Sequence, residues 1–437
     1  MMLRDVGEAV TRVVLSDSYS ISLSSGWIKY LFLILSVVLF LGAFTDHFVF
    51  GVGYGADLSN TPKIINSLLK FPLYFISLYM IFRNYKFFSE FVYEMKYYLA
   101  FVFLCMISTY WTADKFDAIV TIFSLAMCLL VAFGLAQYYT LEQINTGLYW
   151  TFLFLCLSSI FYVFFIPSLG LMSAGEGFEY TGLVGENQGV FKHKNIFGGF
   201  AAISLAFSVV FYEGSKLSRA IIFTSSLVCL FLASSSTKIF ALAFAFVFYY
   251  GFIFSAKVMK SKRNGVALFF TSSSVLIVIF LVSNLIVYLI ELAGKDLTFT
   301  GRTVIWEHAL LLIKEKYLIG YGVSSIWSTD LGYIPEIHFF IPSHSHNSFI
   351  EILLMVGILG LSLMMLFILK GFWDGFVRFF SFGRMSSFFV VVFVFALLDS
   401  CFEYTFFRGN NFLFMFVLFL YSSVIIQNLR LSNPGRV

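Results

Sequence analysis

The residues best suited to catalysis are His344 and His346, near the end of a long polar segment. Residues 343–347 read Ser-His-Ser-His-Asn. An imidazole accepts a proton near neutral pH, because its unperturbed pKa is about 6.5. His344 and His346 are therefore candidates for a general base. Zinc binding is one alternative: it would need a third ligand such as His338 or Glu351, and the chain contains no His-Glu-x-x-His pattern. A purely structural role is the other alternative.

A second group of polar residues combines positive charge with a predicted helix start. Residues 189–199 read Gly-Val-Phe-Lys-His-Lys-Asn-Ile-Phe-Gly-Gly, and they place Lys192, His193, Lys194 and Asn195 at the mouth of a predicted span. Two ammonium groups and an imidazole at a helix N-terminus favour an anion, because the free N–H groups and the helix dipole add to their charge. The alternative is an interfacial cluster that only anchors the span.

Arg302 follows a glycine and opens a predicted helix over residues 302–317. Its guanidinium is a planar fork of donors that suits phosphate oxygens. The alternative is a solvated helix start. Glu307 and His308 are interpreted as surface residues of the same helix.

Two acids stand four residues apart near the end of another apolar run. Carboxylates inside a membrane are costly, so Asp399 and Glu403 are candidates for a function. They could equally cap a helix or pair with Arg408. Lys238, which follows a Ser-Ser-Ser-Thr run, could pair with one of the acids or contact a phosphate.

The composition determines what kind of scaffold positions these groups. Of 437 residues, 60% are apolar and only 12% are charged, whereas a soluble domain carries roughly 25% charged residues. A soluble enzyme, a secreted disulfide scaffold and a disordered protein are excluded, and an all-α polytopic membrane protein remains. Twelve spans are predicted, at residues 27–45, 65–82, 97–110, 117–137, 148–170, 196–212, 219–234, 239–255, 268–291, 348–370, 386–403 and 410–428.

The Lys and Arg residues predict the orientation, since cytoplasmic loops carry an excess of them. Both termini are expected in the cytoplasm, and the polar segments 171–195 and 292–347 on the opposite side. The larger of these segments holds the amphipathic helix, which is expected to lie over the membrane surface. The first apolar run is long enough to span and stay, so no cleaved signal peptide is expected. Residues 1–437 are treated as one membrane domain.

Three motifs in the chain resemble those of a known family. His346-Asn347, nine residues, Gly357, two residues and Gly360 resemble the His-[Asn/Ser/Gln]-x9-Gly-x-x-Gly signature of the bacterial O-antigen ligase and O-antigen/exopolysaccharide polymerase superfamily. Ligases usually continue with Thr-Thr, where this chain has Leu-Ser. Residues 189–195 are similar to a segment of the exopolysaccharide and capsule polymerase branch. Gly301-Arg302-x3-Trp306 and the following Gly-Tyr-Gly resemble the large periplasmic loop of the superfamily.

The resemblance implies a membrane glycosyltransferase similar to the C-type enzymes, with its site on the periplasmic side of the bacterial inner membrane. The donor would be a glycan on undecaprenyl pyrophosphate, and no metal or other cofactor would be needed. By this analogy His346 would be the catalytic base, while Lys192, Lys194 and Arg302 would hold the pyrophosphate. The residues expected to support the site or the acceptor are His193, Asn195, His344, Asn347 and Glu403. The two glycines of the signature are expected to allow close helix packing.

Three functions follow as hypotheses. A polymerase would move the growing glycan onto the next lipid-linked repeat unit, and the Lys-His-Lys-Asn segment and the missing Thr-Thr favour it. A ligase would move the finished glycan onto lipid A-core by the same chemistry. A transporter of the same lipid would show inverted repeats and charges in broken helices. The expected partners are these substrates, membrane lipids and a chain-length regulator, and no nucleic acid.

Overall fold

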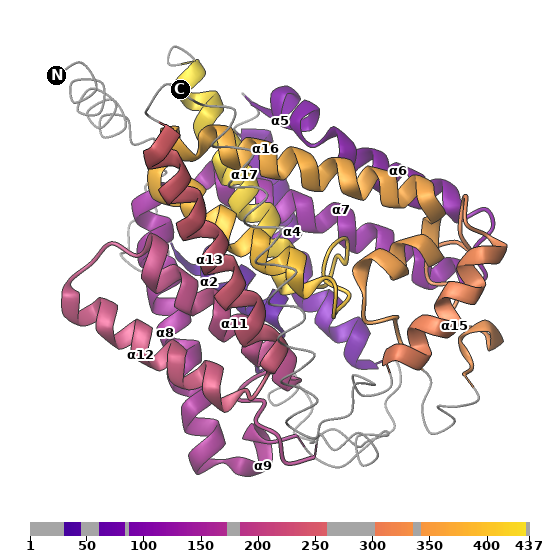
Figure 1. Cartoon of the computed structure of the whole chain (residues 1–437), viewed down its shortest axis with the longest axis horizontal. Coiled ribbons are helices and arrows are strands. Elements are labelled where there is room, and N and C mark those ends of the chain that lie inside the picture. The colour runs from indigo at the N-terminus through magenta and orange to yellow at the C-terminus, as the bar shows by residue number, and fades with distance from the viewer. Residues whose placement is uncertain are drawn as a thin grey trace.

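The computed structural model describes residues 30–44, 61–83, 87–172, 184–259, 302–334 and 342–433. These ranges confirm the all-α fold: they contain helices and loops, and apart from one bridge between Leu171 and Asn187 they hold no strand. Figure 1 shows the helices as one bundle. They are α2 (Leu31–Leu41), α4 (Thr61–Arg83), α5 (Phe88–Glu94), α6 (Lys96–Ser108), α7 (Lys115–Tyr138), α8 (Leu141–Phe165), α9 (Pro167–Gly170), α11 (Lys194–Ala206), η2 (Phe207–Phe211), α12 (Lys216–Leu232), α13 (Ser236–Met259), α15 (Arg302–Glu315), η3 (Asp330–Gly332), α16 (Ser348–Asp399) and α17 (Phe412–Ser432).

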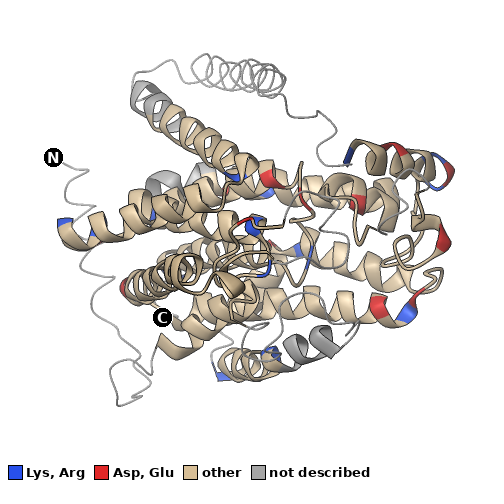
Figure 2. Ribbon diagram, turned by 90° about the horizontal axis from the view of Figure 1, so that it is seen from below, with Lys and Arg blue, Asp and Glu red and all other residues tan. Residues whose placement is uncertain are grey.

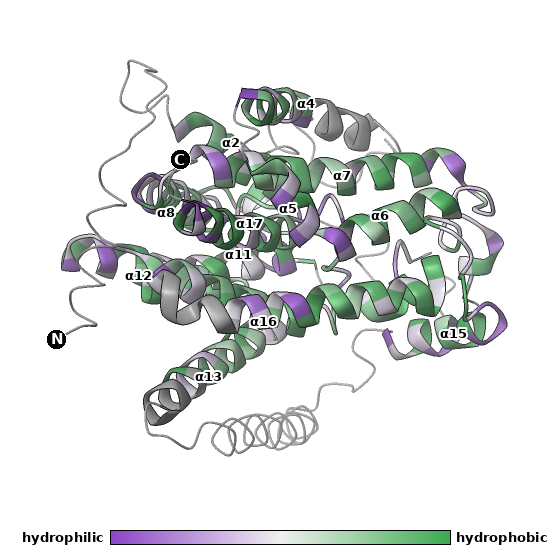
Figure 3. Ribbon diagram, turned by 90° about the horizontal axis from the view of Figure 1, so that it is seen from above, coloured by the Kyte–Doolittle hydropathy of each residue, from purple (hydrophilic) through white to green (hydrophobic). Residues whose placement is uncertain are grey.

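Each predicted span that falls within the described residues coincides with a helix, and span 268–291 lies outside them. In the described part of the chain, five helical segments are long and apolar enough to cross a membrane. A sixth is added if α5 and α6, which meet at 75°, form one broken span. Apolar residues run along most helices (Figure 3), while charged ones gather largely at helix ends and on α15 (Figure 2). The chain is therefore built as a multi-pass membrane protein, and the count of twelve spans stays a prediction.

Helix α17 lies in the interior of the bundle. Every residue from Phe412 to Ile426 is buried, and the helix packs against α7 and α16. Interlocked aromatic rings fill this region: the ring of Phe407, just before α17, lies 4.2 Å from that of Phe101 and 5.4 Å from that of Tyr98. A helix that is apolar on every side has no face to turn to water, so it becomes the centre of the packing.

Helix α16 joins two predicted spans, 348–370 and 386–403, in one helical run that is broken at Val356–Gly357 and at Gly383. Gly357 has φ +63°, and a Cβ there would lie 2.3 Å from the backbone of Leu318. The signature glycine Gly357 therefore allows α16 to break at the point where residues 317–322 approach it. It does not serve helix–helix packing as expected. The break frees Leu354 and Met355 carbonyls, which accept hydrogen bonds from the amides of residues 321 and 322 at 2.8 and 2.9 Å.

The predicted amphipathic helix is present as α15. It buries Ile305, Ala309, Leu312 and Ile313 on one face, at spacings of three to four residues that follow the helical period. It packs against α16 at one edge of the bundle (Figure 1). Its apolar face is thus covered by protein, while Leu311 on another face is 61% exposed.

Candidate active site

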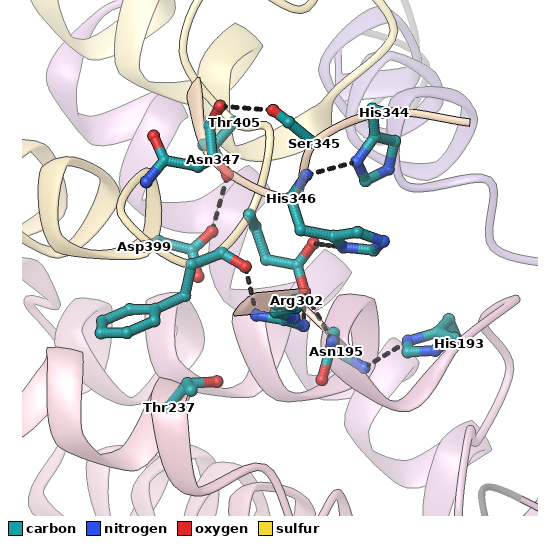
Figure 4. A network of polar contacts seen from close by, with 12 residues as sticks. His193, Asn195, Thr237, Arg302, His344, Ser345, His346, Asn347, Asp399 and Thr405 are labelled. Atoms are coloured by element: carbon teal, nitrogen blue, oxygen red, sulfur yellow. Dashed lines mark hydrogen bonds and ion pairs between the residues drawn. The ribbon is translucent and has the colours of Figure 1, made fainter. Parts of the chain in front are cut away.

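Glu403 lies in the loop between α16 and α17 and gathers three segments that are far apart in the sequence. Its Oε1 atom accepts hydrogen bonds from Asn195 Nδ2 at 2.7 Å and from Arg302 Nη2 at 2.9 Å. Its Oε2 atom lies 3.3 Å from Nδ1 of His346. Figure 4 shows these side chains converging, with the second guanidinium nitrogen of Arg302 bonded to the Phe402 carbonyl. Each of the three predicted motifs thus contributes one side chain to a single carboxylate.

The charge state of Glu403 follows from these contacts. Burial alone would raise the pKa of its carboxyl group, but the hydrogen bond with His346 and the positive charge of Arg302 outweigh it and hold the pKa well below its usual range. An ionised carboxylate accepts hydrogen bonds and cannot donate them. Nδ1 of His346 must therefore carry the proton of this bond, so Nε2 is the ring nitrogen that can accept a proton.

The backbone places His346 in an unusual conformation. Its φ is +55°, in the left-handed region that non-glycine residues seldom adopt. Asn347 follows as the cap of α16, with Oδ1 accepting from the amides of Phe349 and Ile350 at 2.9 and 3.1 Å. Its Nδ2 donates to the Cys401 carbonyl at 3.0 Å. Asn347 therefore ties the histidine segment to the loop that carries Glu403.

Ser348 forms a second tie between the same two segments. Its hydroxyl accepts from the amides of Thr405 at 2.8 Å and Phe406 at 3.0 Å. Its own amide donates to the Ser400 carbonyl at 2.8 Å. Because both ends of the short loop are held, the separation of His346 and Glu403 is set by the backbone.

His344 packs directly on the other histidine. The two ring centroids are 4.2 Å apart, and Nδ1 of His344 accepts from the amide of His346 at 3.2 Å. Its Nε2 lies 3.3 Å from Nη1 of Arg408. Burial, reinforced by the charge of Arg408, holds the pKa of His344 well below its usual value, so its ring is neutral.

The start of α11 supplies the remaining predicted residues. His193 is the cap of this helix, and its Nδ1 accepts from the amide of Asn195 at 3.0 Å. Burial, with a further contribution from the charge of Lys194, lowers the pKa of His193 to about 4. Lys194 pairs with Glu186 at 3.2 Å, and Lys192 is half-buried in the preceding loop. Of the four, Asn195 forms a hydrogen bond with Glu403.

The second predicted acid has a different partner. Asp399 forms a buried ion pair with Lys238 and accepts a hydrogen bond from Thr405 at 2.7 Å. Of the two roles suggested for Lys238, the structure shows the pairing with an acid. The suggested pairing with Arg408 is wrong, since that guanidinium faces His344 and lies 5.4 Å from the Tyr404 ring.

Two residues, Glu351 and Trp306, support the histidine segment through contacts that the sequence did not predict. Glu351 accepts from the Ser345 amide at 2.7 Å and from Trp327 Nε1 at 2.9 Å, so its carboxylate supports the histidine segment. Trp306 Nε1 donates to the Ser345 carbonyl at 2.8 Å. The sequence marked Trp306 as part of the Gly301-Arg302-x3-Trp306 resemblance, but its spacing did not predict this contact.

His308 and His338, two other histidines considered in the sequence, are not part of the cluster that the structure describes around Glu403. His308 contacts the Leu331 carbonyl at 2.7 Å on α15 and takes no part in the Glu403 cluster. His338, suggested as a third zinc ligand, lies outside the described residues. Within the described ranges no three His, Cys, Asp or Glu side chains are grouped closely enough to hold a metal ion.

Comparison with known proteins agrees with the predicted resemblance. Residues 220–365 match the family model described as O-antigen ligase. Over 226 residues the chain is 28% identical to the exopolysaccharide production protein ExoQ of Rhizobium meliloti (strain 1021). That alignment covers 48% of this chain and 51% of the relative, so it spans about half the length of each. The two matches confirm that the chain resembles the O-antigen ligase and polymerase superfamily, as its motifs predicted.

Proposed function

We propose that the chain is a polysaccharide polymerase that transfers an undecaprenyl-pyrophosphate-linked glycan to the next lipid-linked repeat unit. The observation that carries the proposal is the convergence of His346, Arg302 and Asn195 on the Glu403 carboxylate. The similarity to an exopolysaccharide production protein supports a polymer as the product.

The reaction is written as one inverting displacement. Nε2 of His346 takes the proton of the acceptor hydroxyl while the hydroxyl oxygen forms a bond to the anomeric carbon of the donor. The bond from that carbon to the pyrophosphate oxygen breaks, and its electron pair leaves with the pyrophosphate. The Glu403 carboxylate stabilises the imidazolium that forms. General-base assistance of this kind contributes typically about 10²–10⁴-fold to the rate.

Positive charge near the leaving group lowers the barrier further, because preorganised charge is strongest in a site from which water is excluded. Lys192, Lys194 and Arg302 are proposed for this role. A pyrophosphate is already a good leaving group, so the step as written needs no metal ion and no organic cofactor. Arg302 has a second task, since its guanidinium fixes Glu403 and the Phe402 carbonyl.

The placement in the cell is part of the proposal. The Lys and Arg pattern supports cytoplasmic termini and an active site on the opposite side of the membrane. By the resemblance, this membrane is proposed to be the bacterial inner membrane and that side the periplasm. Residues 1–437 are proposed to form one membrane domain. A chain-length regulator is a proposed partner.

A ligase is the second candidate, because the family model that matches residues 220–365 is described by that activity. It would use the same residues, and its acceptor would be lipid A-core.

The deciding experiment reconstitutes the purified protein with one lipid-linked repeat unit and no lipid A-core, and sizes the products. A ladder of lipid-linked oligomers supports the polymerase. Transfer that begins only when lipid A-core is added overturns the polymerase in favour of the ligase. A folded protein that transfers under neither condition contradicts both, and lipid transport would then be measured.

A further inference from the structure

A pocket of about 310 Å³ lies between the N-terminal part of α8 and the start of α12. The two helices pack against each other in the bundle (Figure 1). The side chains that line the pocket are aromatic or carry a hydroxyl or amide group: Asn145, Thr146, Tyr149, Trp150, Tyr212 and Ser218. These residues do not contact the Glu403 cluster, so the pocket is a separate feature of the molecule.

Three aromatic rings give the pocket its shape. The rings of Tyr149 and Tyr212 stack with their centroids 4.8 Å apart, and the Trp150 ring lies 5.1 Å from that of Tyr149 at an angle of 75°. The Tyr212 hydroxyl donates to the Ser218 hydroxyl at 2.8 Å. Tyr212 directly follows the π-helical turn η2, and turns of this kind occur often at functional sites.

The loop that carries Tyr212 is held in place from α8. Asn145 donates through Nδ2 to the carbonyl of Glu213 at 2.8 Å and accepts through Oδ1 from its amide at 2.9 Å. The Glu213 carboxylate pairs with Arg384, so its charge is compensated by α16. The fold therefore forms the pocket before any ligand binds.

The polar groups that the pocket leaves free are donors. Among the described residues, no protein acceptor receives the hydrogen of the Thr146 hydroxyl, the Tyr149 hydroxyl or the Trp150 indole. An indole N–H can only donate, and a hydroxyl can donate as well. Three donors beside one pocket favour a ligand rich in acceptor oxygens, such as a phosphate.

Positive charge lies at the same place. Arg219 Nη2 donates to the carbonyl of Tyr212 at 2.8 Å, and Lys216 is the first residue of α12. Within the part of the chain that the structure describes, no carboxylate pairs with either cation. A ligand that carries negative charge complements this arrangement.

The pocket and the Glu403 cluster lie toward opposite ends of the helices that cross the membrane. Helix α8 is one of the helices long and apolar enough to do so, and the pocket lies near its start. Near its end, Ser159 accepts from the amide of Val190 at 3.4 Å, in the loop that leads to Asn195 of the cluster. Trp150 is 60% exposed, and tryptophan is enriched where a membrane meets water.

We propose that the pocket binds the headgroup of an anionic phospholipid in the leaflet opposite the Glu403 cluster. The phosphate oxygens accept from Tyr149 and Trp150 and meet the charge of Arg219, while the acyl chains stay in the bilayer. The Lys and Arg pattern predicts that this side is cytoplasmic, where anionic lipids are abundant and basic pockets between helices bind them. Lipid binding here is independent of glycan transfer, so it holds for a polymerase and a ligase alike.

The test titrates the purified full chain in detergent with dioleoyl phosphatidylglycerol and counts bound lipids by native mass spectrometry. Dioleoyl phosphatidylcholine is the comparison, because it has the same acyl chains and phosphate but no net charge. The wild type should bind phosphatidylglycerol at least tenfold more tightly. Arg219→Gln and Trp150→Leu should each weaken this binding tenfold or more. Tyr149→Phe keeps the stacked ring and loses only the hydroxyl, so it should weaken binding by less.

The matched controls make the same changes outside the pocket. Arg83→Gln removes an exposed guanidinium that donates to the Tyr79 hydroxyl on α4, and Trp373→Leu removes a tryptophan of α16 that is 68% exposed. Both should bind phosphatidylglycerol as the wild type does. The thermal unfolding temperature checks that each variant is folded. If Arg219→Gln fails to fold, Trp150→Leu still decides, because its side chain is largely exposed.

Three results would overturn the site. The first is equal binding of the two phospholipids by the wild type, which would leave only a general affinity for lipid. The second is wild-type affinity for phosphatidylglycerol in folded Arg219→Gln and Trp150→Leu, or an equal loss in the two controls. The third is binding of inorganic phosphate that depends on Arg219 without any binding of phosphatidylglycerol, which would show a site for the free anion.

Discussion

His346 Nδ1 lies 3.3 Å from Oε2 of Glu403, across a sequence separation of 57 residues. The carboxylate selects the ring tautomer, because it is ionised and can only accept. It also compensates the positive charge that appears when the ring takes a proton. The side chain of His346 is 29% exposed and that of Glu403 is 15% exposed, so the imidazole is the more accessible member of the pair.

Glu403→Gln should lower the turnover number by about 10²–10⁴-fold. The amide keeps the shape of the side chain but removes the charge that stabilises a protonated His346. It also leaves the half-buried guanidinium of Arg302 without an ion pair. Product formation per minute by reconstituted protein at saturating lipid-linked substrate measures the effect.

A matched control for this substitution is Glu213→Gln. Glu213 forms an exposed ion pair with Arg384 at 2.5 Å, and pairs of this kind contribute about 0–1 kcal/mol. Turnover should stay near the wild-type value in this control. A folded Glu403→Gln protein that is equally active would show that the carboxylate does not support the base.

His346→Ala should abolish transfer while the protein remains inserted and folded. The residue lies in a loop ahead of α16 and its side chain is 29% exposed, so its loss costs little packing. His308→Ala is the control, because its ring lies on α15 and contacts the Leu331 carbonyl, away from the Glu403 cluster. Transfer by folded His346→Ala within tenfold of the control would rule out the general base.

The sequence predicted the helices and the residue types of the site because both follow from local information. A uniformly apolar run that crosses a membrane forms a helix, since every backbone group must be hydrogen-bonded within the segment. The histidines, Arg302, Asn195 and the acid Glu403 stand out in a chain with so few charges. What local information cannot supply is the partner, and here the three contacts of Glu403 cross 57, 101 and 208 residues.

Two other features depend on long-range contacts in the same way. Lys194 looked equivalent to Lys192, but a carboxylate from the preceding loop, Glu186, pairs with it. The Gly-x-x-Gly pattern is also typical of close helix packing, and only the approach of residues 317–322 shows that Gly357 serves a break. In both cases the deciding atoms belong to another segment of the chain.

Arg302→Lys should reduce activity more than a retained positive charge would suggest. The guanidinium bonds Glu403 through one nitrogen and the Phe402 carbonyl through the other. One ammonium group cannot reproduce this planar two-point geometry. We expect a loss of about tenfold or more, equivalent to roughly 1.4 kcal/mol. Arg430→Lys, at the far end of α17, serves as the control, and equal activity of the two variants would leave Arg302 as an ordinary helix start.

Gly357→Ala should destabilise the protein. The residue has φ +63°, and the new Cβ would lie 2.3 Å from the Leu318 backbone, which cannot move aside as a flexible side chain can. Backbone strain alone costs about 1–3 kcal/mol. Gly251→Ala on α13 is the matched control, since its new Cβ meets no atom within 4 Å. The thermal unfolding temperature should fall only in Gly357→Ala, and an equal temperature in both variants would contradict the break described for α16.

The pH dependence of the protein's stability should depend in part on His193. Burial, with the charge of Lys194, lowers its pKa to about 4 in the folded chain, whereas an unperturbed histidine titrates near 6.5. Between these values the unfolded chain binds more protons, so the free energy of unfolding decreases as the pH falls from about 6.5 to about 4. His193→Asn keeps an acceptor suited to the start of α11 and removes this titration. Its unfolding temperature should therefore drop less than that of the wild type between pH 7.5 and pH 5. His308→Asn should follow the wild type, and a wild-type pH dependence in His193→Asn would show that His193 is not the neutral cap of the helix.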